Sequence, residues 1–152
     1  MLINPLCTAS IPSSGGHGPI DILVNNAGIE RHGSVEEMPL SEIRRVMKIN
    51  YFGVIRCIKA VLANMRQNKE GCIINVSSMA GKIVLSPLGP YSASKFALEA
   101  ITEALAQDLT PYNIRVSLVE LGIINTDLAT DITNNDPSVY PQVRRIGHFW
   151  TE

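Results

Sequence analysis

The sequence predicts an α/β domain with a parallel sheet. Three short apolar runs, at 21–25, 72–77 and 114–119, alternate with two segments of helical periodicity, at 41–68 and 90–109. Nearly continuous apolar strands are typical of a parallel sheet buried on both faces, and the strand–helix–strand order indicates right-handed crossovers. The chain has 152 residues, 45% of them hydrophobic, which is enough for one domain with its own core.

We expect residues 1–18 to form an irregular N-terminal segment and residues 19–152 to form the domain. The first segment carries two prolines and three glycines without periodicity. Its glycines are not interpreted as a dinucleotide-binding fingerprint, because no strand precedes them and a strand begins at Asp21.

The first helix is predicted over 41–68. Its apolar residues are spaced by three and four positions: Ile43, Val46, Met47, Val54, Ile58, Val61, Leu62 and Met65. Ser41, just after Pro39, is a suitable N-cap, and Gly71 is expected to end the segment.

The second helix is predicted over 90–109. Pro90 suits the first position of a helix, and Pro111 is expected to end it. The apolar face of this helix comprises Ala97, Leu98, Ile101, Ala104, Leu105 and Leu109. After Asp127 the chain turns polar, and only a helical turn is predicted there.

Composition excludes several classes of function. The chain has 13 Lys and Arg against 14 Asp and Glu, so it offers no basic field for nucleic acid or a membrane surface. No run of 18 apolar residues exists, and the N-terminus lacks the features of a signal peptide. Its three cysteines and three histidines show no metal-binding spacing. These features predict a cytoplasmic protein without a metal site.

Candidate functional residues lie where ligands bind in parallel α/β sheets, beyond the carboxyl ends of the strands. The run at 21–25 ends in Asn25-Asn26-Ala27-Gly28, whose small residues allow a ligand to approach the backbone. An ordinary turn is the alternative. The next strand ends in Ser77-Ser78, where a hydroxyl can donate to a substrate oxygen or cap the following turn.

Two further candidates lie on the predicted helices. Asn50 falls in an apolar stripe, where its amide needs a ligand, a water or a backbone partner; a structural Asn beside a helix distortion is the alternative. Tyr91 and Lys95 lie one turn apart on one face, so the ammonium is expected to lower the phenol pKa. Tyr-x-x-x-Lys alone is weak, because it arises by chance with a probability of roughly one in five.

Taken in order, these residues resemble the short-chain dehydrogenase/reductase family over about residues 18–128. The match comprises the run at 21–28, Asn50, Ser77-Ser78, Tyr91-Ser92-Ala93-Ser94-Lys95 and the loop at 122–126. The resemblance implies a partial Rossmann-like parallel sheet with flanking helices. It also implies NAD(P)-dependent interconversion of an alcohol and a carbonyl on a small molecule by hydride transfer.

The resemblance further implies roles for single residues. Tyr91 would be the general acid/base, and Lys95 would lower its pKa and hold the nicotinamide ribose. Ser78 would polarise the carbonyl, and Asn50 would support a water in the proton relay. The cofactor-binding residues would be Asn25, Asn26, Ala27 and Gly28 on the floor of the site, together with Tyr91, Lys95, Gly122, Ile124 and Thr126.

The sequence departs from the family pattern at two places. Glu120-Leu121-Gly122 stands where the family usually has Pro-Gly. The glycine-rich strand–turn–helix that binds the cofactor pyrophosphate is expected to be absent. A βαβ unit needs about 30 residues, and only 20 residues of this sequence precede the strand that begins at Asp21. We therefore expect a truncated, inactive form, and whether the family cofactor is NAD or NADP is undecided. The alternative is a non-enzymatic fragment that associates with a full-length relative, or a homo-oligomer, through the helices at 41–68 and 91–109.

Overall fold

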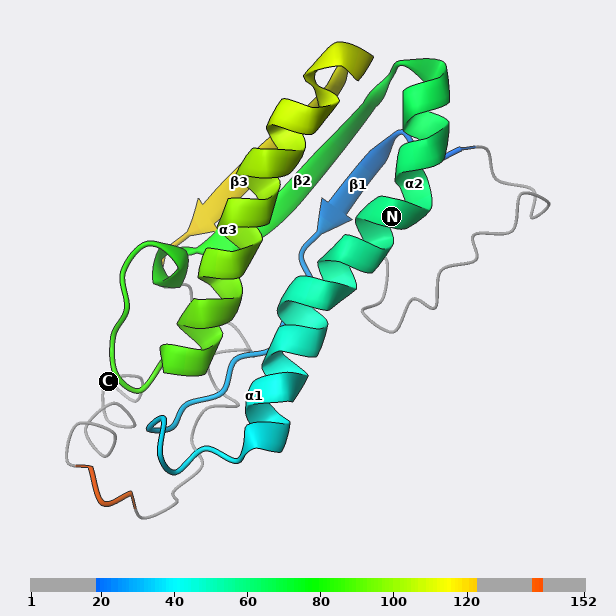
Figure 1. Ribbon diagram of the computed structural model, residues 1–152. Helices are drawn as coiled ribbons and strands as arrows, with labels where there is room; N and C mark the ends of the chain where they lie inside the picture. The colour runs from blue at the N-terminus through cyan, green and yellow to red at the C-terminus, as the bar shows by residue number, and fades with distance from the viewer. Residues whose placement is uncertain (1–18, 123–137, 141–152) are drawn as a thin grey trace.

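The computed structural model describes residues 19–122 and 138–140, and within them it contains a three-stranded parallel sheet (Figure 1). The strands are β1 (Ile22–Asn25), β2 (Gly71–Ser78) and β3 (Ile114–Leu121), in the order β1-β2-β3. Leu23 pairs with Ile73, and Ile73 pairs with Val116. The predicted α/β class with a partial Rossmann-like sheet is therefore confirmed, and β2 and β3 are slightly longer than predicted.

The long helix predicted over 41–68 is divided into three consecutive segments. These are α1 (Leu40–Met47), a π-helical segment η1 (Lys48–Gly53) and α2 (Val54–Asn68). The periodicity continues through η1, because a π-helical segment adds residues without ending the helix.

The helix ends at Asn68 as predicted and begins one residue early, at Leu40, but the residues predicted to cap it are wrong. Ser41 is not the N-cap. Pro39 is, and its carbonyl accepts from the backbone N–H of Glu42 at 2.9 Å. At the other end Lys69 takes the left-handed conformation, with φ of 51°. Gly71 instead begins β2, where a Cβ atom would lie 2.6 Å from the sulfur of Met65. Glycine is therefore needed there for close packing of the strand on α2.

The second helix agrees with its prediction. It is α3 (Gly89–Leu109), with Pro90 in its first turn, and a 3-10 turn η3 (Thr110–Tyr112) that contains Pro111 follows it. A further 3-10 turn, η2 (Met79–Gly81), follows β2. No helix among the described residues is both long enough and apolar enough to cross a membrane.

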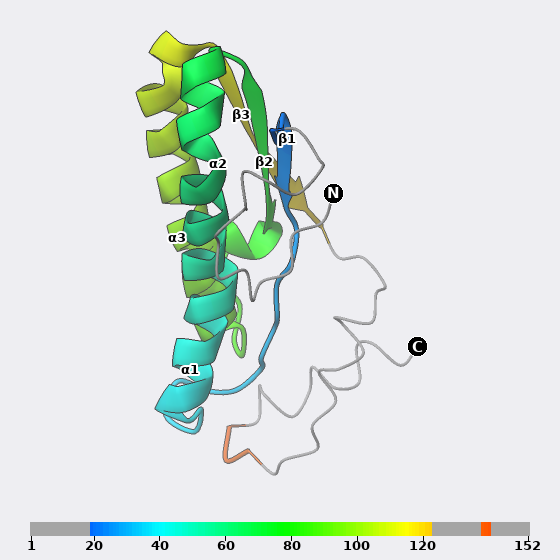
Figure 2. The same cartoon turned by 90° about the vertical axis from the view of Figure 1, so that its right-hand side faces the viewer.

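Both long helices pack on the same face of the sheet (Figure 2). The core lies between them and the strands and comprises Leu23, Val54, Cys57, Ile58, Val61, Met65, Ile73, Leu98, Leu109 and Ile114. Within the described ranges, no helix covers the opposite face. We call that the open face, and its apolar side chains are Ile22, Val24, Cys72, Ile74, Val76, Val119 and Leu121. The predicted irregular segment 1–18 lies outside the described residues.

Candidate active site

The carboxyl ends of the strands bring several predicted residues together. Ser78 is the last residue of β2, and Tyr91 and Lys95 occupy the first two turns of α3. Asn50 reaches the same region from η1. Residues from three separate elements therefore meet at one edge of the sheet, as expected for a parallel α/β site.

Ser78 and Tyr91 form the centre of this cluster. The Tyr91 phenol is buried, and a side-chain hydrogen bond with Ser78 acts to lower its pKa. The Ser78 hydroxyl also accepts from the backbone N–H of Ala80 at 3.2 Å, which caps η2. Ser78 thus has the capping contact that the sequence allowed as an alternative, together with a contact to the proposed acid/base.

Lys95 lies one turn from Tyr91 on the same helical face, as its spacing predicted. Its ammonium donates to the Val76 carbonyl at 2.9 Å and lies 5.7 Å from the centroid of the Tyr91 ring. Burial lowers the pKa of Lys95 to about 8, against the opposing effects of the Glu30 and Glu99 carboxylates. An ammonium carries three N–H donors, so donors remain for a ligand beside the bond to Val76.

The predicted effect of Lys95 on Tyr91 is wrong in this arrangement. The pKa of Tyr91 is raised, first by burial and then by the Glu30 carboxylate, and only the Ser78 hydrogen bond opposes them. Burial disfavours the charged phenolate. The Lys95 ammonium, which is itself bonded to Val76, does not offset that cost.

Asn50 is held by backbone rather than left free for a water. Its Oδ1 accepts from the Ile29 N–H at 2.9 Å, and its Nδ2 donates to the Ile29 carbonyl at 2.8 Å and to the Ser94 hydroxyl at 3.0 Å. The π-helical distortion places this amide inside the apolar stripe, so the structural alternative for Asn50 is observed. These bonds tie the loop after β1 to η1 and α3, and the predicted role of Asn50 in a proton relay stays a prediction.

That loop passes close to the candidate catalytic residues. A Cβ atom on Gly28 would lie 3.3 Å from Asn50 Oδ1 and 4.0 Å from the Lys95 ammonium, so the missing side chain keeps this approach open. Asn26 and Ala27 are exposed, and so is Gly122. The other two predicted cofactor contacts, Ile124 and Thr126, lie outside the described residues.

Asn25 ties the end of β1 to the interior of β2. Its Nδ2 donates to Asn75 Oδ1 at 2.8 Å, and Asn75 Nδ2 donates to the Thr102 hydroxyl at 2.9 Å. Asn75 and Thr102 were not singled out from the sequence, although an Asn inside an otherwise apolar strand was a signal available there.

Sequence reasoning also missed a carboxylate–imidazole contact between Glu30 and His32. Glu30 Oε1 lies 2.6 Å from His32 Nε2, and both side chains are largely buried. The Glu30 carboxylate raises the pKa of both Tyr91 and Lys95. No spacing rule indicates this pair, because its position depends on the path of the loop that Asn50 holds.

A cavity of about 540 Å³ lies on the outer side of two loops. Its lining residues come from 33–36, 84–87, Gly89 and Tyr140. Two segments far apart in sequence, the loop before α3 and Tyr140, therefore meet at this cavity. Ser78, Tyr91 and Lys95 are not among the lining residues.

Comparison with known proteins identifies the family. The family model described as short chain dehydrogenase matches residues 13–137. Dehydrogenase/reductase SDR family member 7B of Xenopus laevis is 40% identical over 123 residues, which cover 81% of this chain and 38% of that protein. The 3-ketodihydrosphingosine reductase of Bacteroides thetaiotaomicron is 45% identical over 109 residues, covering 72% of this chain and 40% of that protein.

Solved structures of proteins with similar sequences share the fold of this chain. A gluconate 5-dehydrogenase from Burkholderia cenocepacia, in complex with NADP and tartrate, is 30% identical with a TM-score of 0.74, covering 78% of this chain and 46% of its own. A short-chain dehydrogenase from Streptomyces avermitilis is 38% identical with a TM-score of 0.69. The match covers 72% of this chain and 41% of that protein. This chain thus spans less than half the length of these relatives. Its fold, the cluster at the strand ends and these matches agree: the chain belongs to the short-chain dehydrogenase/reductase family.

Proposed function

We propose that this chain carries the proton-transfer residues for interconversion of an alcohol and a carbonyl on a small molecule, with NAD or NADP as the hydride carrier. The observation that carries the proposal is the buried Tyr91 phenol, whose pKa the Ser78 hydroxyl acts to lower, with the Lys95 ammonium 5.7 Å from its ring centroid. In this role Tyr91 exchanges a proton with the substrate oxygen, and Ser78 donates a hydrogen bond to that oxygen.

The direction of the Tyr91 pKa fits a role as proton donor. Because the pKa is raised, the phenol keeps its proton at neutral pH. A protonated phenol is the donor that reduction of a carbonyl requires. Lys95 supplies positive charge one turn away, and Asn50 positions the loop at Gly28 and Ile29 rather than exchanging a proton itself.

The described residues fit the nicotinamide-ribose end of the cofactor. Gly28 leaves space beside Lys95, and the Lys95 ammonium has donors that its bond to Val76 does not use. The nicotinamide ring supplies or accepts the hydride when it is bound. Two solved structures of relatives hold bound NADP, which supports this cofactor class. Contacts from Asn25 to Gly28 and from Gly122, Ile124 and Thr126 stay predictions.

The substrate is proposed to be a small alcohol or carbonyl compound with an apolar portion. The cavity that precedes the first turn of α3 is lined by Val35, Val84, Leu85 and Gly89, and its polar groups come from Ser34, Glu36 and Tyr140. The named substrates of the relatives, a ketosphingoid base and gluconate, differ widely in polarity. They therefore support the reaction class rather than one compound.

Binding of the reduced cofactor tests the proposal directly. We expect NADH or NADPH to shift the NMR signals of Gly28, Tyr91 and Lys95 in the 152-residue chain, and Lys95→Met to weaken this binding about tenfold or more. We also expect little turnover by the chain alone, because no glycine-rich strand–turn–helix is found among residues 19–122. Strong turnover that survives Tyr91→Phe would refute the assigned roles.

The second candidate function is association without catalysis, and exposed aromatic residues on the helices favour it. Phe52 of η1 is 50% exposed and Phe96 of α3 is 42% exposed. Large exposed apolar side chains on neighbouring elements are typical of an interaction surface. Sedimentation velocity tests this function: the parent chain should self-associate or bind a full-length relative, and Phe52→Lys with Phe96→Lys should abolish that. A monomer that binds no relative would exclude it.

A further inference from the structure

We propose that Glu99 and Lys82 form a positioning ion pair that holds Ser78 against Tyr91 from behind the site. The proposal rests on the roles proposed above for Ser78 and Tyr91, but it concerns residues that take no part in proton transfer. It gives a function to a buried charge that the reaction does not use.

Glu99 is the charge that needs an explanation. It lies on α3, one turn beyond Lys95, and its residue is only 5% exposed. A buried carboxylate is costly unless it is paired and hydrogen-bonded. Its partners are the Ser77 hydroxyl, which donates to Oε1 at 2.8 Å, and the Lys82 ammonium, 2.7 Å from Oε2.

These partners lie on both sides of Ser78 in the chain. Ser77 is its neighbour in β2, and Lys82 follows the η2 turn that the Ser78 hydroxyl caps. Glu99 therefore fixes the chain before and after Ser78 to α3, the helix that carries Tyr91. The distance between the two hydroxyls then depends on a rigid connection rather than on a free loop.

Gly81 shows how closely the turn is held. A Cβ atom at this position would lie 2.3 Å from Glu99 Oε1 and 2.9 Å from the Ser77 hydroxyl. The turn therefore lies directly on the carboxylate, and any larger residue would push η2 away from α3. Glycine is required here by close approach, not by a positive φ.

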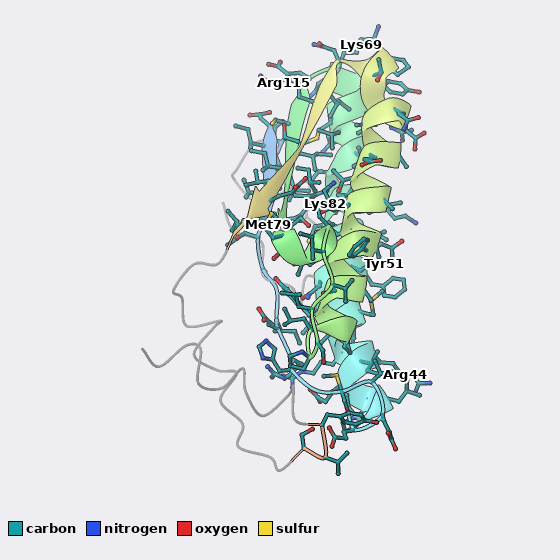
Figure 3. All side chains as sticks on the ribbon, turned by 90° about the vertical axis from the view of Figure 1, so that its left-hand side faces the viewer. Arg44, Tyr51, Lys69, Met79, Lys82 and Arg115 are labelled. Carbon is teal, nitrogen blue, oxygen red and sulfur yellow. The ribbon has the colours of Figure 1, made fainter. Side chains whose placement is uncertain are left out.

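Lys82 extends the connection to a third segment. Its ammonium also lies 3.4 Å from Glu120 Oε1, near the end of β3 (Figure 3). The pKa of Lys82 is raised, mainly by its hydrogen bond to Glu99. One ammonium thus joins the end of β3, the residue after the η2 turn and α3.

The titration of Tyr91 reports on this positioning. Difluorotyrosine at position 91 provides a fluorine NMR signal for this phenol, and its electron-withdrawing fluorines bring the titration closer to neutral pH. The groups that shift the Tyr91 pKa are Glu30 and Ser78, together with burial; Glu99 is not among them. Glu99 also raises the pKa of Lys95, which lies beside the Tyr91 ring, so Ser77→Ala, which changes no charge, is the variant that isolates the path through Ser78.

The sign of the change in the Tyr91 titration midpoint separates positioning from a direct charge effect. Because the Ser78 hydroxyl lowers the Tyr91 pKa, Ser78→Ala should raise the titration midpoint of Tyr91. This change is the maximum against which the other variants are compared. We expect Ser77→Ala and Glu99→Ala to raise the midpoint in the same direction, with Glu99→Ala giving most of the Ser78→Ala value. Removing a negative charge that acted directly would lower the midpoint.

Glu103→Ala is the matched control, because this exposed carboxylate lies one turn further along α3. Its midpoint should equal that of the parent. Ser77→Ala changes no charge and little volume, so it decides the question if Glu99→Ala does not fold. An unchanged or lowered midpoint in folded Ser77→Ala would overturn the proposal. Loss of cofactor binding with an unchanged Ser77→Ala effect would instead count against the proposed function alone.

Discussion

The two ends of the helix–sheet interface differ sharply in polarity. On β1 and β2 the pair Leu23 and Ile73 is apolar and fully buried, and two residues further along the next pair is Asn25 and Asn75. Toward the amino ends of the strands the interface is a packed hydrocarbon core. Toward their carboxyl ends it buries amides, hydroxyls, an ammonium and a carboxylate.

This difference separates the residues that stabilise the fold from those that prepare the site. Apolar pairs contribute through burial, roughly 25 cal/mol per Å². Buried polar groups contribute little net stability even when fully paired, but each pair fixes a geometry. The carboxyl end is therefore the part of the interface where stability is exchanged for a defined arrangement.

Truncation at the apolar end should have the largest effect. Leu23→Ala or Leu98→Ala removes a side chain that is buried at 0% or 1% exposure, and a cavity remains. The expected loss in the free energy of unfolding is about 2–5 kcal/mol. Urea denaturation checks the value, and Leu62→Ala, at the half-buried border of the core, is the control that should lose less.

Replacing a buried charge at the polar end should increase the free energy of unfolding rather than lower it. Lys95 is buried with its pKa lowered to about 8, so at neutral pH the folded chain holds an ammonium that burial disfavours. Lys95→Met removes this cost and also the bond to Val76. We expect a net stabilisation of about 1–3 kcal/mol at pH 7, at the expense of cofactor binding.

The pH dependence follows from the same shift. Between pH 8 and 10.5 the unfolded chain binds the Lys95 proton while the folded chain has released it, so this residue adds stability as pH rises. The advantage of Lys95→Met should therefore shrink across that window. An advantage that stays constant from pH 7 to 10 would show that Lys95 is not the titrating group.

The Asn25–Asn75–Thr102 chain should have an intermediate effect. Asn75→Ala leaves the Asn25 amide and the Thr102 hydroxyl without their partner, at a cost of about 1–3 kcal/mol. Thr102→Val breaks only the second bond. A double-mutant cycle should give a coupling of about 1 kcal/mol, and additive effects would show that the chain of bonds contributes nothing.

The apolar end was largely predictable from sequence. The spacing of Ile58, Val61 and Met65 and the continuous run in β2 determine element type, and the strand–helix order determines the parallel sheet. The helix ends were not predictable, because Lys69 adopts a left-handed conformation that favours glycine, while Gly71 is needed for contact with Met65.

The polar end was predictable as a set of positions but not as a set of contacts. Motif spacing identified Asn50, Tyr91 and Lys95, yet their partners come from residues far apart in sequence. Glu99 shows the limit: on a helical pattern it is an ordinary surface carboxylate, and only the fold reveals that it is buried against Ser77. The raised Tyr91 pKa was missed for the same reason, since burial is a property of the packed structure.

The smallest expected effect lies on the open face. Val119 is 39% exposed there, whereas Val116 on the same strand packs against the core. Val119→Thr should change the free energy of unfolding by less than about 0.5 kcal/mol, and Val116→Thr should cost about 1–3 kcal/mol because it buries a hydroxyl. Equal losses in the two variants would mean that the open face is covered in the folded chain. Equal losses that appear only at high protein concentration would assign that cover to a second copy, because only association depends on concentration.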